Sequence, residues 1–454
     1  MANTYLSRTP SSTGNRKTWT FSTWIKRGDV HSTYQTLFSG YVDANNFTRI
    51  LFWDDQRLTV NGKDGGSFPI DLRISNQQND TSGWYHIVVA FDTTQATDTN
   101  RIKIYINGEQ KTSFEGTATY PSQNYDTFVN HTNLQVLGQT GDSTNYFEGA
   151  MTHIQLVDGT ALTPSEFGET DTTSGIWTIK TGNYATPGTN GFSLKGESSA
   201  NLGLDSSSSS NNLTVSGNAS QLKDNPDISY NTFNENQRLA GANPAVIYSG
   251  KGWKSPSGSQ GVTGLNFMPQ TGKWYFEFYF DSEDGNRGVN YGMVNLETFD
   301  NFRTGVGGNA DTTGFYGIQN REASDDARNQ ENGSDGSLTS LPALAAGDYA
   351  MIAIDMDNRK MFIGKNGTWS NSGNPTAGTG NVVTFTSDAD YMYTVGGSSN
   401  SARPVQYYNF GDGCFGNTAL TGTTYSDGDS QGTFKYTVPT GFYCMNTKSI
   451  NTRG

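Results

Sequence analysis

A tryptophan near the end of a candidate strand is followed by a cluster of charged residues. Trp53 precedes Asp54, Asp55 and Arg57 in the stretch LFWDDQR. An aromatic ring with a few hydrogen-bonding groups in a shallow groove is sufficient to bind a sugar. These four residues are therefore candidates for carbohydrate binding, and the alternative is that Trp53 belongs to the core. Trp369, in the stretch TWSNSGNP, leaves the same two interpretations open.

Paired carboxylates would be needed for a glycoside hydrolase. Such enzymes place two carboxylates about 5–10 Å apart across a cleft. The stretch FEFYFDSED carries Glu277, Asp281 and Glu283, and Asp281 already lies at the end of the predicted strand. A strand edge followed by a solvated turn is the favoured interpretation, so we predict that the protein is not an enzyme.

Histidines and cysteines offer no recognisable metal or redox motif. The histidines are His31, His86, His131 and His153, and none of their spacings is typical of a metal site. His86 has apolar neighbours in a strand, which favours a hydrogen-bonded structural histidine. Cys414 and Cys444 are too few for a disulfide framework. Two free buried thiols are favoured over a single disulfide.

Alternating apolar and polar residues predict the β-strands that position these side chains. In TWTFSTWIKRG (18–28), Trp19, Phe21 and Thr23 share one face, and the opposite face carries Thr18, Thr20, Ser22 and Trp24. Further strands are predicted over 46–53, 83–92, 100–110, 131–139 and 146–162, and then over 272–280, 290–295, 314–319, 348–357, 359–367, 389–397 and 404–411. Gly, Asn and Asp punctuate the gaps, as hairpin turns require.

Shorter features accompany these strands. TPSEFGE (163–169) predicts one helical turn, with Thr163 as its cap and Pro164 at its first position. Residues 320–337 lack apolar periodicity and predict an exposed loop. In the hairpin 349–369, Asp355, Asp357 and Asn358 are interpreted as turn formers in preference to metal ligands.

Length and composition predict a two-domain, all-β protein. The chain has 454 residues, of which 16% are charged, 33% are hydrophobic and 54 are glycine. We predict domains over 1–195 and 245–454. The Ser/Asn/Gly-rich residues 196–244 are interpreted as an irregular connector, partly packed through Leu202, Leu204 and Leu213, and a floppy linker is the alternative.

Charge and hydropathy limit the partners. The net charge of −13 disfavours nucleic acid. The sequence has no apolar run long enough to span a bilayer, and MANTYLSRTPSS lacks the apolar region of a signal peptide. We therefore expect synthesis in a cytoplasm and no membrane insertion.

Two family resemblances follow from these strands. WTFSTWIKR, LFSG, GWYHIVVAFD, IKIYINGEQ and YFEGAMTHIQLVDGTALTPSEFG resemble the concanavalin A-like, laminin G-like lectin modules over residues 5–170. GKWYFEFYF, AIDMDNRKMFIGKNGTW, YYNFGD and VPTGFYCMNT resemble the SPRY module over residues 245–447. The implied fold is all-β, with a jelly-roll concanavalin A-like sandwich, an irregular connector and a SPRY-like sandwich, both sandwiches being antiparallel.

The first resemblance also implies a possible cofactor. Laminin G-like modules often hold one calcium ion at a loop rim, and hard oxygen ligands suit this ion. The candidate ligands are Asp43 and Asn45 in YVDANNF, and Asp142 and Glu148 in QTGDSTNYFEG. A polar turn without an ion is the favoured interpretation of each stretch, and no other cofactor is predicted.

The pairing of these modules looks like a virion protein of a tailed phage, made in the host cytoplasm. We expect a non-enzymatic tail-fibre or receptor-binding component that contacts host-surface polysaccharide. The alternative is a head or tail decoration protein that binds neighbouring virion proteins without recognising glycan. The expected partners are other virion proteins, host polysaccharide and further copies of the chain, and a trimer would suit a fibre.

Overall fold

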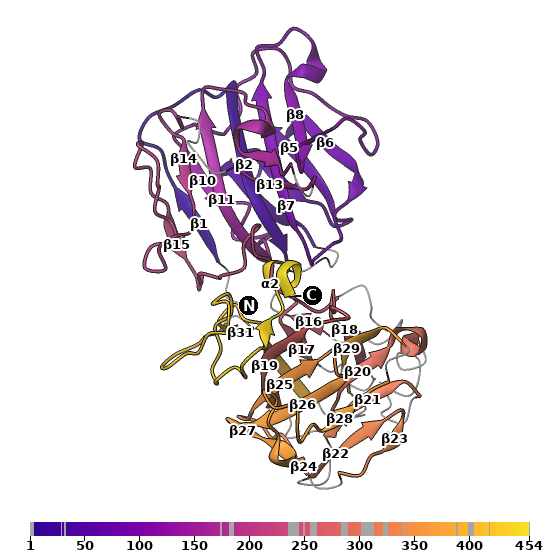
Figure 1. Cartoon of the computed structure of the whole chain (residues 1–454). Coiled ribbons are helices and arrows are strands. Elements are labelled where there is room, and N and C mark those ends of the chain that lie inside the picture. Colours follow the sequence, from indigo (N-terminus) through magenta and orange to yellow (C-terminus); the bar gives the residue numbers. More distant parts are fainter. Residues whose placement is uncertain are drawn as a thin grey trace. The chain divides into compact units, whose positions relative to one another are not determined.

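A computed structural model describes residues 4–28, 30, 33–172, 175–180, 186–234, 245–247, 250–254, 261–282, 289–300, 313–320, 326–338, 341–386, 389–397, 404–416 and 418–453. The chain divides into two compact units. Unit 1 comprises Met1–Gln221 and Asn225–Asp227, and unit 2 comprises Leu222–Asp224 and Ile228–Gly454. Both units consist mainly of β-strands in antiparallel sheets (Figure 1), which confirms the predicted all-β fold class.

Unit 1 contains two large antiparallel sheets. The seven-stranded sheet has the spatial order β15 (Thr214–Ser216), β1 (Tyr5–Arg8), β10 (Leu134–Leu137), β3 (Gln35–Asp43), β4 (Asn46–Phe52), β5 (Arg57–Asp64), β6 (Ser67–Gln77). The six-stranded sheet has the order β14 (Phe192–Leu194), β11 (Gly149–Asp158), β2 (Thr18–Arg27), β7 (Trp84–Asp92), β8 (Ile102–Ile106), β9 (Glu109–Lys111). A small sheet pairs β12 (Gly168–Thr170) with β13 (Trp177–Ile179).

The core of unit 1 lies between its two large sheets. Side chains alternate along β2, so Trp19 and Phe21 point to the same side. The ring of Phe21 stacks on Phe38 of the opposite sheet with 4.8 Å between centroids, and Trp19 stacks on Phe91 at 4.0 Å. All four side chains are buried. These contacts make unit 1 a β-sandwich, with the predicted Trp19 face of the strand turned inward.

The outer face of the six-stranded sheet is also covered. Val88, Tyr105 and Val157 form a second buried cluster with Phe167. Phe167 follows the 3-10 helix η2 (Pro164–Glu166), which confirms the predicted helical turn with Pro164 in its first turn. Thr163 occupies the N-cap position, as predicted, but its side chain makes no capping hydrogen bond.

The predicted connector is divided between the units. Residues up to Gln221 belong to unit 1, where β15 pairs with β1. Leu213 is buried, but Leu204 is 44% exposed and does not pack as predicted. Residues 235–244 lie outside the described residues. The boundary drawn by the structure is therefore later than residue 195, because this polar segment adds an edge strand to the first sandwich.

Unit 2 has a nine-stranded and a seven-stranded sheet. The main path of the first is β16 (Ala245–Ile247), β17 (Gly252–Lys254), β30 (Pro404–Asn409), β19 (Lys273–Ser282), β25 (Tyr349–Asp355), β26 (Lys360–Lys365), β27 (Thr368–Trp369). β28 (Val383–Thr384) pairs with β26, and β33 (Tyr443–Cys444) runs parallel to β19. The second path is β18 (Gly261–Gly264), β29 (Tyr391–Gly397), β20 (Val289–Asn295), β21 (Phe315–Asn320), β22 (Asp326–Glu331), β23 (Ser334–Asp335), with β24 (Leu341–Pro342) on β22. β31 (Cys414–Phe415) and β32 (Thr418–Ala419) form a separate pair.

Aromatic contacts join the two large sheets of unit 2. Phe276 of β19 meets Tyr393 of β29 edge-on at 4.8 Å, and Phe278 of β19 meets Tyr291 of β20 at 5.2 Å. All four rings are at most 2% exposed. Unit 2 is therefore a second β-sandwich, as its alternating strands predicted.

The prediction of an exposed loop over 320–337 was wrong in part. β22 and β23 occupy residues within this range, and Asn329 and Gln330 are buried, whereas most residues from 331 to 337 are exposed as predicted. Asn329 accepts the N–H of Leu338 and donates to the carbonyl of Val382, at 2.9 and 3.1 Å. This strand shows no apolar periodicity because it buries amide side chains, which bond to backbone groups and to Asp335.

The hairpin from β25 to β26 has the predicted turn chemistry. Asp355 accepts hydrogen bonds from the backbone N–H and the side chain of Asn358, at 3.0 and 2.9 Å. Asp357 accepts the N–H of Gly272 at 2.8 Å. These side chains stabilise the turn by bonding its own and neighbouring backbone.

Both cysteines are buried and free, as predicted. The described C-terminal end forms α2 (Thr447–Arg453). In the part of the chain that the structure describes, no helix has the length and apolar character needed to cross a membrane.

Candidate functional site

The predicted carbohydrate residues at the end of β4 lie together, but their neighbours already contact them. Trp53 is half-buried, with the ring of Tyr34 edge-on at 4.8 Å and the guanidinium of Arg73 at 5.0 Å from its centroid. Asp55 forms ion pairs with Arg57 at 2.6 Å and with Arg73 at 3.1 Å.

Asp54 is exposed beside this cluster. In unit 2, Trp369 is partly buried against the core and lies edge-on to Tyr275 at 6.4 Å. The sequence left core and binding roles open for both tryptophans. The contacts give each indole a packing role, and its part in sugar binding stays a prediction.

Three of the four candidate calcium ligands take part in local turns, and Glu148 contacts a residue distant in sequence. Asp43 accepts the N–H of Asn45 at 2.8 Å, and this hydrogen bond is the main reason why the pKa of Asp43 is lowered. Asp142 accepts the N–H of Thr144 at 3.1 Å. Glu148 is half-buried, and its backbone carbonyl accepts the N–H of Gly28 at 2.8 Å. Among the described residues, no group of three or more His, Cys, Asp or Glu side chains could hold a metal.

Glu277 is fully buried, so the prediction of a strand edge was wrong for this residue. Its carboxylate accepts hydrogen bonds, each of 2.8 Å, from the backbone N–H groups of Lys435 and Tyr436 and the hydroxyl of Tyr275. Burial raises the pKa of Glu277 to about 7 against the opposing effect of these bonds. This carboxylate holds a C-terminal segment on β19. Asp281 lies half-buried further along the strand, and Glu283 lies outside the described residues.

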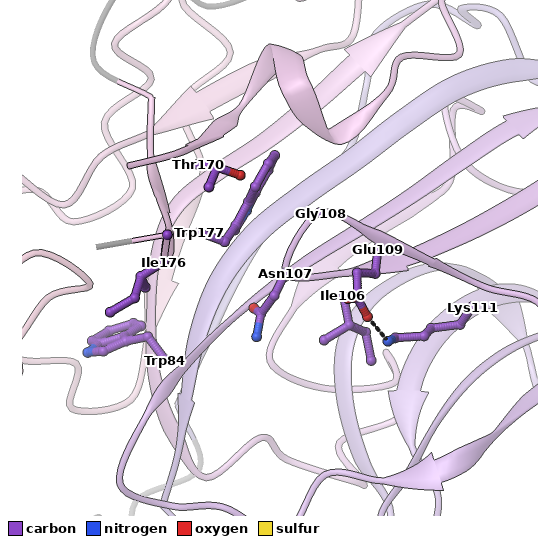
Figure 2. Close-up of a pocket in the computed structure, with 10 residues that line it drawn as sticks. Trp84, Ile106, Asn107, Gly108, Glu109, Lys111, Thr170, Ile176 and Trp177 are labelled. Carbon is purple, nitrogen blue, oxygen red and sulfur yellow. Dashed lines mark hydrogen bonds and ion pairs between the residues drawn. The ribbon is translucent and has the colours of Figure 1, made fainter. Parts of the chain in front are cut away.

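A pocket of about 560 Å³ lies in unit 1 where β8 turns into β9 and β13 begins (Figure 2). Its described lining residues are Trp84, Ile106, Asn107, Gly108, Glu109, Lys111, Thr170, Gly175, Ile176 and Trp177. In the view of Figure 2, Trp84 and Ile176 lie on one side of Asn107, and Glu109 and Lys111 lie on the other.

The pocket combines apolar and polar side chains. Trp84 and Trp177 are half-buried, and Ile176 is 66% exposed. Lys111 forms an ion pair of 2.9 Å with Glu109, which lowers the pKa of Glu109. Among the described lining residues Glu109 is the only carboxylate, whereas glycoside hydrolysis requires a pair.

His86 contacts Trp177, which forms one wall of the pocket. His86 is fully buried on β7, and its ring stacks on Trp24 at 4.7 Å. The centroid of Trp177 lies 6.0 Å away, with the two ring planes within 19° of parallel. The backbone N–H of His86 donates to Asn107 at 2.8 Å, so the same residue also supports the β8–β9 turn. The predicted structural, hydrogen-bonded histidine is thereby confirmed.

The tautomer of His86 follows from its two ring contacts. An indole nitrogen can only donate, so Trp177 donates its N–H to Nδ1 of His86, with 2.9 Å between the nitrogens. Nε2 must then carry the proton and donate to Oγ of Ser22 at 2.9 Å. Burial lowers the pKa of His86 to about 3, so the ring is neutral at ordinary pH.

Two glycines make room for the ring of Trp177. A Cβ at Gly168 would lie 2.6 Å from the indole, and a Cβ at Gly108 would lie 2.7 Å from it. Gly108 also has a φ of +83°, which favours glycine in this turn. Trp177 is thus held in one position by two glycines and by His86.

This arrangement can bind a ligand through ring stacking and hydrogen bonds. The indole rings offer apolar faces, while Asn107, Lys111 and Thr170 offer polar atoms at the rim. Such a mixture of rigid aromatic and polar groups suits a polyhydroxylated molecule such as a sugar.

The sequence placed Trp84 in the predicted strand 83–92 and indicated a binding role for neither Trp84 nor Trp177. The pair Ile176–Trp177 is an isolated apolar dipeptide in a Thr/Ser/Gly-rich stretch. Such a pair can indicate a segment that docks on a sheet, but its docking position could not be read from the sequence.

Comparisons with known proteins agree with the first resemblance. Residues 2–167 match a family model described as the concanavalin A-like lectin/glucanases superfamily. Unit 1 is thus an antiparallel β-sandwich most of which is similar to this superfamily. A search of curated proteins found no match to the chain.

Solved structures similar to parts of the chain include two domains and a pentraxin. The SPRY domain of human HERC1 is 19% identical, with 39% of this chain and 96% of that chain covered and a TM-score of 0.29. A heptameric SAP-like pentraxin from Limulus polyphemus is 18% identical, with coverages of 36% and 72% and a TM-score of 0.27. Domain 4 of an extracellular arabinanase from Geobacillus stearothermophilus, in complex with arabinotriose, is 23% identical, with coverages of 33% and 65% and a TM-score of 0.26.

Proposed function

We propose that the protein is a non-enzymatic glycan-binding protein and that the Trp84–Trp177 pocket of unit 1 is its binding site. The observation that carries this proposal is the fixed position of Trp177 beside the polar rim. An indole held by His86, Gly108 and Gly168 loses little conformational freedom when a sugar stacks on it. The similarity of residues 2–167 to a superfamily of lectins and glucanases supports the same function.

A glycan array followed by calorimetry tests this proposal. The full chain is compared with Trp84→Ala and with Trp53→Ala, because these tryptophans represent the pocket and the site predicted from the sequence. We expect Trp84→Ala to weaken binding about tenfold through loss of aromatic contact, and Trp53→Ala to leave it nearly unchanged. The reverse result would place the site at the end of β4, and the absence of any glycan ligand would refute the proposal.

The assignment to a virion rests on the sequence resemblances alone. We propose that the protein is a tail-fibre or receptor-binding component of the virion and that its pocket contacts host-surface polysaccharide. We further propose that copies of the chain form an oligomer such as a trimer. Electron microscopy of labelled particles would locate the protein, and light scattering would give its oligomeric state. Co-assembly on heads or tails with no binding to host cells would favour the decoration alternative.

A further inference from the structure

Three tyrosines form a row on the outer face of the nine-stranded sheet in unit 2. Tyr279 of β19 is directly opposite Tyr349 of β25 and Tyr407 of β30 in the strand register. Phe278 and Phe280, its neighbours in sequence, are buried, and Phe278 contacts Tyr291 of the opposite sheet. Because side chains alternate along a strand, Tyr279 points away from the core.

The rings in this row, here called the tyrosine strip, are close to one another. The centroid of Tyr279 lies 5.0 Å from that of Tyr349 and 6.2 Å from that of Tyr407. The rings of Tyr279 and Tyr407 are within 9° of parallel. All three residues are partly exposed, and the described members of the buried core cluster include Tyr275 but none of these three.

The chain covers part of this outer face and reaches the strip at Tyr349, whose ring lies 5.1 Å from Phe415 and 6.2 Å from Tyr436. Further along β19, Tyr275 is covered by Phe434 at 4.9 Å, and Glu277 binds the backbone of Lys435 and Tyr436. That half of the face is therefore occupied by the chain itself. The next outward-pointing residue on β19 is Tyr279, which remains partly exposed.

Charges of both signs border the strip. The ammonium of Lys435 lies 4.5 Å from the ring centroid of Tyr349. Asp281 acts electrostatically on Tyr279, and Asp348 is paired with Lys365 at 2.7 Å. This balance of two carboxylates and two ammonium groups favours a ligand without net charge over an acidic or a basic one.

We propose that the tyrosine strip is a second glycan-binding site, which binds a neutral polysaccharide chain by stacking of its sugar rings on Tyr279, Tyr349 and Tyr407. Tyrosine rings offer apolar faces to the C–H faces of sugars, and their hydroxyl groups can bond to sugar hydroxyls. A row of rings across adjacent strands can contact successive units of one chain. This site is separate in sequence and in composition from the pocket of unit 1.

Native electrophoresis in gels that contain galactomannan or hydroxyethylcellulose tests the strip. Every variant carries Trp84→Ala, so that the proposed pocket of unit 1 does not contribute. We expect this background protein to be retarded by at least one of the two polysaccharides. Tyr279→Ala and Tyr407→Ala should each weaken binding about three- to tenfold, and Tyr279→Phe should retain most of it because the ring remains.

Tyr425→Ala is the matched control, since Tyr425 is a 38% exposed tyrosine of the same unit outside the strip. Its binding should equal that of the background. Thermal unfolding of each variant shows whether weaker binding reflects a lost contact or an unfolded protein. If Tyr279→Ala is unfolded, Tyr279→Phe is the variant that is compared with the background.

Four results would overturn the tyrosine strip as a site for neutral polysaccharide. The first is no retardation of the background by either polysaccharide, and the second is equal retardation of Tyr279→Ala and Tyr425→Ala. The third is stronger retardation by anionic alginate, and the fourth is a strip-dependent contact with a protein and not with glycan. Failure of the unit 1 proposal is distinguishable, since it appears as unchanged oligosaccharide binding in Trp84→Ala alone.

Discussion

The indole N–H of Trp177 donates a hydrogen bond to Nδ1 of His86, with 2.9 Å between the two nitrogens. The two residues are 91 positions apart, and their ring planes are within 19° of parallel. Because His86 is buried, this bond fixes a half-buried wall of the pocket to the interior of the sheet. The proposed sugar platform is therefore rigid as a result of a core contact.

Trp177→Phe tests this bond, because phenylalanine retains a ring but has no N–H. Nδ1 of His86 would remain buried without its donor, which costs about 1–3 kcal/mol of unfolding free energy. Denaturant unfolding measures this loss. Trp53→Phe is the matched control, and we expect a smaller effect because its contacts with Tyr34 and Arg73 are made by the ring. Equal effects of the two variants would argue against a specific role for the bond.

Gly168→Ala tests the close packing of Trp177 on Gly168 without changing an aromatic residue. The new Cβ would lie 2.6 Å from the indole, which has no flexible end that could move aside. We expect Trp177 to shift, with a loss of about 1–3 kcal/mol in stability through overpacking and weaker glycan binding.

Calorimetric titration and denaturant unfolding of Gly168→Ala measure the two effects. Gly428→Ala in unit 2 is a control, because its Cβ would lie 3.3 Å from the nearest atom of Tyr443. Unchanged glycan affinity in Gly168→Ala would contradict the proposal that packing on Gly168 positions Trp177 for glycan binding.

The pKa of His86 predicts a loss of stability on acidification. In the folded protein this pKa is about 3, whereas in the unfolded chain it returns to about 6.5. Below pH 6.5 the unfolded state binds a proton that the folded state does not. Stability is therefore complete above this pH and is lost as the pH falls towards 3, by about 1.4 kcal/mol per pH unit.

Unfolding of the wild type and of His86→Gln at pH 7.5, 6.5, 5.5 and 4.5 isolates this contribution. Burial also lowers the pKa of His153, which acts in the same direction and is common to both proteins. The stability difference between wild type and variant should shrink by about 2 kcal/mol between pH 6.5 and 4.5. Parallel pH profiles of the unfolding free energy of the two proteins would mean that His86 takes up its proton at the same pH in the folded and the unfolded protein.

A buried ion pair in unit 2 predicts that removal of one partner destabilises the protein more than replacement of both. Lys251 pairs with Asp412, and their side chains are 3% and 0% exposed. Asp412→Ala would leave a buried ammonium without this carboxylate, which costs about 3–5 kcal/mol. Replacement of both residues, Lys251→Met with Asp412→Leu, should cost less because no charge remains buried.

Chemical denaturation of the full chain checks this order of stabilities. Glu197→Ala in unit 1 is a control for an exposed pair, since Glu197 lies 3.9 Å from Lys195 and its side chain is 72% exposed, and it should change little. A double variant as unstable as Asp412→Ala would show that the pair itself provides the stabilisation.

The alternation of side chains determined the strands and their inward faces. Trp19 and Phe21 point into the core and Trp24 points to the other face, as the pattern TWTFSTW predicted. This was possible because the pleat of a strand has a fixed period of two residues. The pattern failed at Asn329 and Glu277, which are buried polar residues with hydrogen-bond partners distant in sequence. It also failed at Gln330, which is buried and donates to Asp335 nearby.

The two proposed sites depend on contacts between residues distant in sequence, which no local sequence pattern encodes. From the sequence, Trp53 with its charged neighbours was a better binding candidate than Trp84 or Trp177, because clustering along the chain was the only proximity available. The fold brings Trp177 over β7, against His86 and between Gly108 and Gly168. Likewise, only the register of β19 with β25 and β30 aligns Tyr279 with Tyr349 and Tyr407. The sequence by itself determined which residues form strands, whereas tertiary structure decided which aromatic rings meet, since that depends on long-range packing.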